Sequence, residues 1–148
     1  MMRVWTLPTL LALCGALAAA GPASKGSPVT AAVVLLVFLA LAAMNSPLVF
    51  PGSIGAQEAE RRAEADGRPI VFWRPGCTYC MRLRLRLGRS AHRMHWVNIW
   101  HDPAGAATVR AANNGNETVP TVVVLGTNGE RSTLTNPPPA EVKKALER

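Results

Sequence analysis

The first third of the chain has almost no charged side chains. Between positions 4 and 50, Lys25 is the single residue of Lys, Arg, Asp or Glu type, and all nine acidic residues lie after position 57. The mildly positive mean hydropathy therefore sums two unlike parts, an apolar front and a polar, basic domain. This distribution excludes one domain of uniform character over all 148 residues.

Cysteines and aromatic residues are also scarce. The chain has three cysteines, and Cys14 lies in the apolar front, where a cysteine is expected to act as a small apolar residue. This leaves one pair, Cys77 and Cys80. Aromatic side chains make up 5% of the residues, and no groove-reading motif accompanies the net charge of +7. The sequence therefore argues against nucleic acid as a partner.

Two apolar stretches fill the front of the chain. Residues 4–20 are at the lower limit for a membrane helix, and residues 29–50 are long enough to span a bilayer. Residues 21–28 carry Gly, Pro, Ser and Lys and are predicted to form the turn between them. We therefore expect a transmembrane helical hairpin within residues 1–51. The alternative is a cleavable signal peptide, indicated by Arg3 and the alanines before position 21, followed by one anchor helix.

Basic residues soon after the second stretch predict the orientation. Arg61, Arg62 and Arg68 follow it closely, as the positive-inside rule expects of a cytoplasmic flank. We therefore expect a protein of the cell membrane, with the lipid bilayer as a partner and the C-terminal domain in the cytoplasm. Residues 52–68 are predicted to be a linker with a short helix between Gly55 and Gly67.

The most informative motif is Cys77-Thr78-Tyr79-Cys80. It follows a short apolar run at 70–73, which predicts a buried strand, and the turn signal Pro75-Gly76. Residues 81–87 continue it without a helix breaker. A C-x-x-C between a strand and a helix is typical of thiol–disulfide exchange proteins. The free N–H groups and the dipole of the helix N-terminus stabilise a thiolate there, which makes it nucleophilic near neutral pH.

The remaining segments predict a compact α/β domain over residues 69–148. We expect strands at 95–100, 121–125 and 131–134, a helix from 102 to about 113, and a last helix at 140–148. Asn128-Gly129 is a strong hairpin signal between the last two strands. The expected order is β-α-β-α-β-β-α, with a parallel first half and a terminal hairpin.

This order, with C-x-x-C after the first strand, resembles the thioredoxin fold in its glutaredoxin-type form. Three runs resemble the mycoredoxins, actinobacterial glutaredoxin-like proteins that reduce mixed disulfides with mycothiol. These runs are Trp73-Arg74-Pro75-Gly76-Cys77-Thr78-Tyr79-Cys80, Asn113-Asn114-Gly115-Asn116-Glu117-Thr118-Val119-Pro120-Thr121 and Leu134-Thr135-Asn136-Pro137. The resemblance covers residues 69–148. Thr78 departs from it, because Pro or Gly is usual between the cysteines.

The resemblance implies a catalytic role for both cysteines. Cys77 would be the nucleophile that attacks a protein–mycothiol mixed disulfide, and Cys80 or a second mycothiol would resolve the product. It also implies that Pro120 forms a cis bond with Val119. The low-molecular-weight thiol would be a co-substrate, with no cofactor bound to the protein.

The resemblance also implies which residues bind the thiol substrate. They are Arg74, Tyr79, Thr118, Val119 and Pro120, with Thr135 or Asn136 near the sugar part of the ligand.

Metal binding is the main alternative use of the cysteines. Cys77, Cys80, His92 and His95 come close to zinc-finger spacing, but both gaps are one residue short, so no metal site is predicted. A shared iron–sulfur cluster is less favoured still. The three histidines are interpreted as solvated loop or strand-edge residues.

Other interpretations remain open at this stage. The arginines between 82 and 93 form a basic cluster, interpreted as a solvated helix face, a contact for anionic lipid or a steering surface for acidic substrates. Trp73, Trp96 and Trp100 are interpreted as core and strand residues. The alternatives to an oxidoreductase in the cytoplasm are a membrane-tethered redox sensor or binding module, and an extracytoplasmic disulfide reductase.

Overall fold

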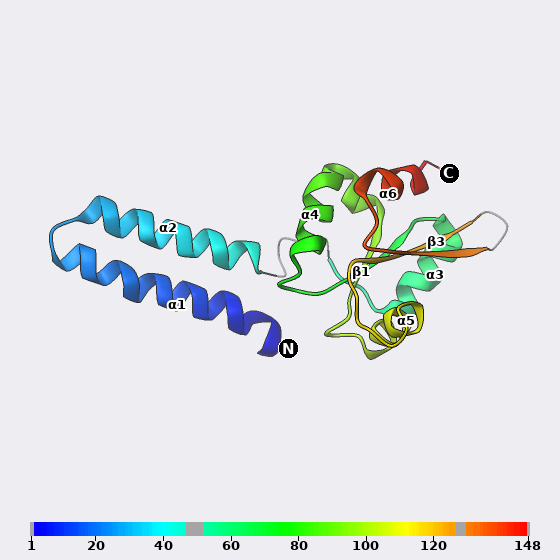
Figure 1. Cartoon of the computed structure of the whole chain (residues 1–148), viewed down its shortest axis with the longest axis horizontal. Helices are drawn as coiled ribbons and strands as arrows, with labels where there is room; N and C mark the ends of the chain where they lie inside the picture. Colours follow the sequence, from blue (N-terminus) through cyan, green and yellow to red (C-terminus); the bar gives the residue numbers. More distant parts are fainter. Residues whose placement is uncertain (1, 47–51, 127–129, 148) are drawn as a thin grey trace. The chain divides into compact units, whose positions relative to one another are not determined.

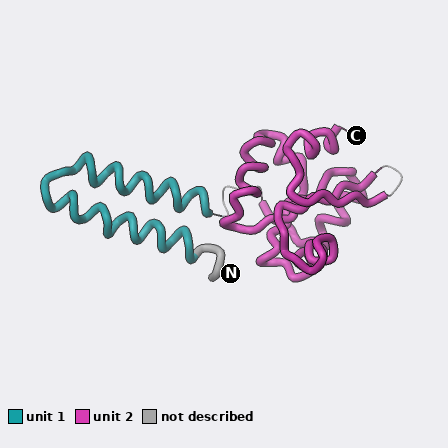
Figure 2. The backbone as a smooth tube through the Cα atoms, in the orientation of Figure 1, with its two compact units in different colours: residues 1–49 teal, residues 50–148 magenta. Residues whose placement is uncertain are grey.

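The computed structural model describes residues 2–46, 52–126 and 130–147, and side chains from position 6 onward. The chain divides into two compact units, Met1–Val49 and Phe50–Arg148 (Figure 2). Each unit is described by itself below.

The first unit is a pair of helices joined by a tight turn. Helix α1 spans Met2–Ser24 and α2 spans Pro28–Met44, and the two pack side by side (Figure 1). A side chain at Gly15 would collide with Phe38, so this glycine lets the two backbones approach closely. The turn is shorter than the predicted 21–28, because α1 continues through Pro22 to Ser24.

The outer surfaces of this pair are apolar. Residues Thr6–Ser24 form one helix that is long and apolar enough to cross a membrane, whereas α2 has 17 residues. The predicted end of the second stretch, near position 50, lies outside the described residues. Large apolar side chains are exposed along both helices, among them Leu10, Leu13, Leu17, Val29, Val33, Leu36, Val37 and Met44.

The second unit has a four-stranded sheet preceded by helix α3 (Ala56–Asp66). Its strands are β1 (Ile70–Trp73), β2 (His95–Asn98), β3 (Thr121–Leu125) and β4 (Arg131–Thr135), in the spatial order β2-β1-β3-β4. β1 and β2 are parallel, and β3 is antiparallel to both β1 and β4. This confirms the predicted order of elements and the parallel first half; the hairpin residues Asn128 and Gly129 lie outside the described residues.

The helices form a layer on each face of the sheet (Figure 1). The α3 layer contains α3 and α5 (Pro103–Ala112), which contact each other. On this side Gly105 lies against Phe72 and Val97, where an added Cβ would come within 2.9 Å of Val97 Cγ1. The α4 layer contains α4 (Thr78–Leu87), the 3₁₀ helix η2 (Gly88–Arg93) and α6 (Pro139–Ala145). Trp96 faces this layer, because its indole N–H donates to Ala91 O of η2 at 2.7 Å.

Two sequence interpretations were wrong in this unit. The second strand ends at Asn98 rather than at position 100, so Trp100 lies in a turn and is 51% exposed. Its backbone N–H donates to the side chain of Asn98, which draws the chain out of the sheet. His95 is buried instead of solvated, and its Nε2 lies 3.0 Å from Asp66 Oδ2. His92 and His101 are exposed, as expected.

Candidate active site

Cys77 lies between the end of β1 and the start of α4. The strand ends at Trp73, the turn uses Gly76 at a φ of 76°, and Cys77 is the N-cap of the helix. Its Sγ accepts the backbone N–H of Cys80 at 3.1 Å. This bond satisfies one of the N–H groups that a helix start leaves without a partner, and it would stabilise a thiolate in the reduced protein.

The two cysteines form a disulfide, with their Cα atoms 5.2 Å apart. They differ in access to solvent. Cys80 is completely buried, whereas Cys77 is half-buried at the end of the helix. An incoming disulfide can therefore reach the sulfur of Cys77, and the sulfur of Cys80 can be reached from Cys77.

The backbone before β3 lies opposite Cys77. The Val119–Pro120 bond is cis, as expected, and both residues are buried. The Sγ of Cys77 lies 3.4 Å from the carbonyl oxygen of Val119. The structure thus brings together two segments that are 42 residues apart in the chain.

The predicted sugar-binding residues lie next to this backbone. Thr135 pairs with Thr121 in the sheet, and the N–H of Asn136 donates to Pro120 O at 2.8 Å. Both side chains are exposed, as is Thr118. The hydroxyl of Thr135 donates to Asn113 Oδ1 at 2.6 Å, so its proton is already engaged within the protein.

Asn113 has a role that the sequence analysis did not assign. Its Nδ2 donates to Val109 O at 2.8 Å and to Thr121 Oγ1 at 3.1 Å. The hydroxyl of Thr121, in turn, donates to Thr118 O at 2.7 Å. The Asn113 side chain therefore links the end of α5 to Thr121 of β3 and to Thr135 of β4. Through the Thr121 hydroxyl it also acts on Thr118, at the other end of the Thr118–Thr121 turn. The available signal was the position of Asn113 at the start of a run that resembles the mycoredoxins.

Arg74 and Tyr79 flank Cys77 along the chain. The carbonyl of Arg74 accepts the N–H of Cys77 at 3.4 Å, and its side chain is half-exposed. Tyr79 is 55% exposed, with the guanidinium of Arg82 lying 5.9 Å from its ring centroid. Both side chains are therefore open to a molecule that approaches Cys77.

A metal site finds no support among the described residues, where no group of three or more His, Cys, Asp and Glu side chains could hold an ion. His95, a ligand in the zinc spacing, instead pairs with Asp66. Burial alone would raise the pKa of Asp66, but the N–H of Arg68 and the His95 ring lower it overall. This pair joins the end of α3 to the start of β2, away from the cysteines.

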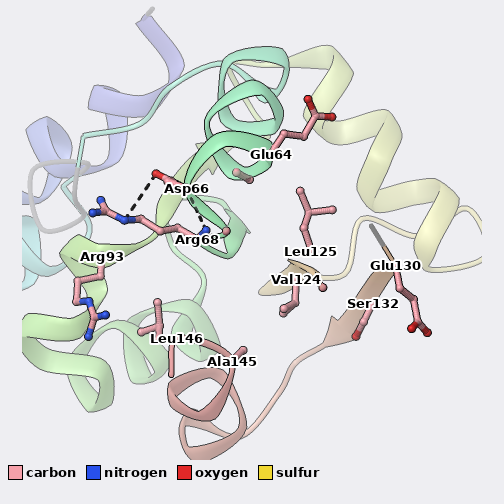
Figure 3. Close-up of a pocket in the computed structure, with 13 residues that line it drawn as sticks. Glu64, Asp66, Arg68, Arg93, Val124, Leu125, Glu130, Ser132, Ala145 and Leu146 are labelled. Carbon is pink, nitrogen blue, oxygen red and sulfur yellow. Dashed lines mark hydrogen bonds and ion pairs between the residues drawn. The ribbon is translucent and has the colours of Figure 1, made fainter. Parts of the chain in front are cut away.

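A wide depression of about 1470 Å³ lies at the opposite end of the sheet (Figure 3). It is bordered by residues before β1 and after β3, including Arg68 and Gly126, whereas Cys77 follows the other end of β1. In Figure 3 the Arg68 side chain folds back onto Asp66, with Nε 3.6 Å from Oδ2. A substrate therefore reaches Cys77 Sγ from an exposed surface, and Cys77 does not line this depression.

A family model and several known proteins match this chain. The glutaredoxin family model matches residues 70–128. Two proteins of Mycobacterium tuberculosis (strains CDC 1551 / Oshkosh and ATCC 25618 / H37Rv), each named "putative glutaredoxin", are 43% identical over 76 residues. That alignment covers 51% of this chain and 86% of each relative. A solved structure titled "DsbH Oxidoreductase" is 16% identical with a TM-score of 0.43, covering 68% of this chain and 89% of its own.

Residues 70–128, which the family model matches, contain the C-x-x-C pair and the turn with the cis proline. The chain therefore belongs to the glutaredoxin family of thiol oxidoreductases.

Proposed function

We propose that this protein is a membrane-anchored glutaredoxin that reduces mixed disulfides between proteins and a low-molecular-weight thiol, with mycothiol as the co-substrate. The observation that carries the proposal is the position of Cys77 Sγ. It accepts the Cys80 N–H at the start of α4 and lies 3.4 Å from the Val119 carbonyl. A thiolate at this position is stabilised and has backbone groups beside it for a bound thiol.

The reaction begins from the reduced pair. The Cys77 thiolate attacks the mycothiol sulfur of a protein–mycothiol disulfide, a new S–S bond forms, and the protein thiolate leaves. A second mycothiol thiolate then attacks the mycothiol sulfur of that adduct and frees Cys77 as oxidised mycothiol departs. Alternatively, Cys80 attacks the sulfur of Cys77, reduced mycothiol leaves, and the disulfide of the structure forms.

Arg74, Tyr79, Thr118, Val119 and Pro120 form the contact surface for the thiol in this proposal. Their placement around Cys77 supports it, as does the exposure of Thr135 and Asn136 beside Pro120. The N–H and carbonyl of Val119 can pair with an extended ligand in the manner of an added strand.

The membrane anchor is supported by the apolar outer surface of α1 and α2. Thr6–Ser24 is long enough to cross the hydrocarbon core, and α2 at 17 residues meets the lower limit for a spanning helix. With three arginines soon after the second helix, the glutaredoxin unit faces the cytoplasm. The orientation is tested with alkaline phosphatase fused to the C-terminus. This reporter is active only outside the cytoplasm, so phosphatase activity of the fusion would contradict the proposed orientation.

The activity is tested with the full chain in a neutral detergent. Reduction of a peptide–mycothiol mixed disulfide by mycothiol is followed for the wild type and for the Cys77→Ser and Cys80→Ser variants. We expect turnover to be lost in Cys77→Ser and retained in Cys80→Ser. Equal turnover in the wild type and Cys77→Ser contradicts the proposal.

A further inference from the structure

One surface beside the reactive cysteine contributes only Tyr79 to the reaction above. Residues three, four and seven positions apart share a face of a helix. On α4 this relation places Tyr79, Arg82, Leu85 and Arg86 on one exposed face, and the exposed Arg89 lies just beyond the end of α4, in η2. We call these five residues the α4 basic face.

The positive charge of this face is not compensated within the protein. There is no Asp or Glu between positions 67 and 101. In the described part of the chain, no carboxylate lies within ion-pair distance of Arg82, Arg86 or Arg89. Arg84 differs from them, because its side chain donates to Gly88 O at the end of its own helix.

Apolar groups are interleaved with these arginines. Leu85 is 67% exposed and Tyr79 is 55% exposed, although both lie on a helix whose opposite side is fully buried. Exposed apolar groups next to charged ones are characteristic of binding surfaces for proteins rather than for simple ions. Arg82, stacked near the Tyr79 ring, brings a cation to the first turn after Cys77.

The position of the face determines what can bind there. It starts at the helix end that carries Cys77, and from Tyr79 to Arg86 it extends about 10 Å along α4, from the rise of about 1.5 Å per residue. An extended peptide covers this length with about three residues, and about five residues reach past the end of α4. A protein whose mixed disulfide is attacked by Cys77 therefore places the residues next to its cysteine along this face, whereas a lipid surface on the face would crowd the approach to Cys77.

We propose that the α4 basic face selects protein substrates that carry carboxylates within about five residues on one side of their reactive cysteine. This inference rests on the proposed function and adds a substrate class to it. Glu and Asp side chains would pair with Arg82, Arg86 and Arg89, and an apolar side chain would cover Leu85.

The test uses three synthetic peptides of equal length with one cysteine each. They carry three glutamates before the cysteine, three glutamates after it, or glutamines at all these positions, and each cysteine is linked to nitrothiobenzoate. The reduced Cys77 thiolate attacks the peptide sulfur, and the coloured nitrothiobenzoate thiolate leaves. Cys80 then attacks Cys77, so that the dithiol supplies both electrons and the peptide thiol is released. The second-order rate of colour release is measured with the reduced full chain in detergent.

We expect one glutamate peptide to react about tenfold faster than the glutamine peptide at low ionic strength. The advantage should disappear in about 1 M salt, where charges are screened beyond about 3 Å. It should also disappear in Arg82→Gln/Arg86→Gln. The matched control, Arg61→Gln/Arg62→Gln, removes the same charge from α3 in the other layer and should keep the preference.

Each other outcome overturns the inference. Equal rates for the three peptides, with normal reduction of the glutamine peptide, contradict the substrate class but leave the proposed function intact. No reduction of any peptide would mean that the proposed function itself fails. If Arg82→Gln/Arg86→Gln keeps the preference for a glutamate peptide, charges outside the α4 basic face cause it, which contradicts the inference. Equal peptide rates, together with amide-exchange protection of α4 in nanodiscs containing phosphatidylglycerol, would assign the face to anionic lipid.

Discussion

The two helix layers of the glutaredoxin unit use arginine in opposite ways. In the α3 layer Arg61 and Arg62 both pair with Glu58, and Glu60 pairs with Arg131 of β4. In the α4 layer, by contrast, all five arginines of α4 and η2 remain without a carboxylate among the described residues. We infer from this difference that the charges of the α3 layer stabilise the fold, whereas the arginines near Cys77 remain available to a binding partner.

The layers also pack differently. α3 buries three alanines, Ala56, Ala59 and Ala63, so its backbone lies close to the sheet. α4 buries Leu83 and Leu87 beside Cys80, so larger side chains fill its interface.

Leu83→Ala should lower the free energy of unfolding by about 2–4 kcal/mol, because it leaves a cavity under α4. Ala59→Gly in α3 should lower it by about 1 kcal/mol, mainly through helix propensity. The measurement is urea unfolding of the full chain in detergent, followed by tryptophan fluorescence. Equal losses in the two variants would show that the layers do not differ in packing.

Asn113→Ala should reduce kcat/KM for mixed-disulfide reduction about tenfold or more. Without its side chain the backbone around Pro120 shifts relative to Cys77, and small displacements at a reacting centre lower the rate strongly. Asn113 is a positioning residue, since it acts through the Thr118–Thr121 turn. The readout is the peptide-concentration dependence of the rate, together with the unfolding free energy. Thr108→Ala, on the same helix α5, is the control. A loss of stability with unchanged kinetics would reduce Asn113 to a structural role.

Asp102→Ala should lower the free energy of unfolding by about 1–2 kcal/mol. Its two carboxylate oxygens cap two helices of the α3 layer: Oδ1 accepts from Gly105 N at 2.8 Å, and Oδ2 accepts from Ala56 N at 2.6 Å. Asp102→Asn keeps one acceptor and should lose less. The same urea titration compares the two variants. Identical losses of unfolding free energy would mean that the acceptor kept by Asn contributes nothing.

Asp66→Asn should cost less than about 1 kcal/mol at neutral pH, since the carboxylate is about one-third exposed and screened by solvent. The folded protein lowers the pKa of Asp66 below its ordinary 3.8. The ionised form is therefore favoured by folding, and its contribution is present above pH 3.8 and is lost as the pH falls through the lower, folded value. Unfolding at several pH values checks this, and a difference that grows toward acid pH would contradict it.

Local signals were enough to predict most of this unit. The strand before Cys77, the helix after it and the order of the remaining elements follow from apolar runs and turn residues. Residues 81–87, which continue the C-x-x-C without a helix breaker, are predicted to be helical, and α4 confirms it. The cis bond before Pro120 followed from the resemblance of its neighbours.

The sequence could not predict what depends on distant partners. His95 is buried because Asp66, 29 residues earlier, reaches its ring. Asp102 was recognised as the start of a helix, but its bond to Ala56 crosses 46 residues. Asn113 gains its role from Thr121 and Thr135, which only the sheet brings beside it. Trp100 was misassigned because the strand ends where Asn98 turns the backbone, and no local pattern marks that end.

The most direct test of the central claim is to trap the first covalent product. The reduced Cys80→Ser chain is mixed with oxidised mycothiol, and intact and peptide masses are measured. The account predicts one mycothiol adduct on Cys77, removed by added mycothiol, and none on Cys77→Ser. An adduct that forms equally well on Cys77→Ser, or none on Cys80→Ser although Cys77 reacts with a small alkylating reagent, would contradict Cys77 as the nucleophile for this thiol.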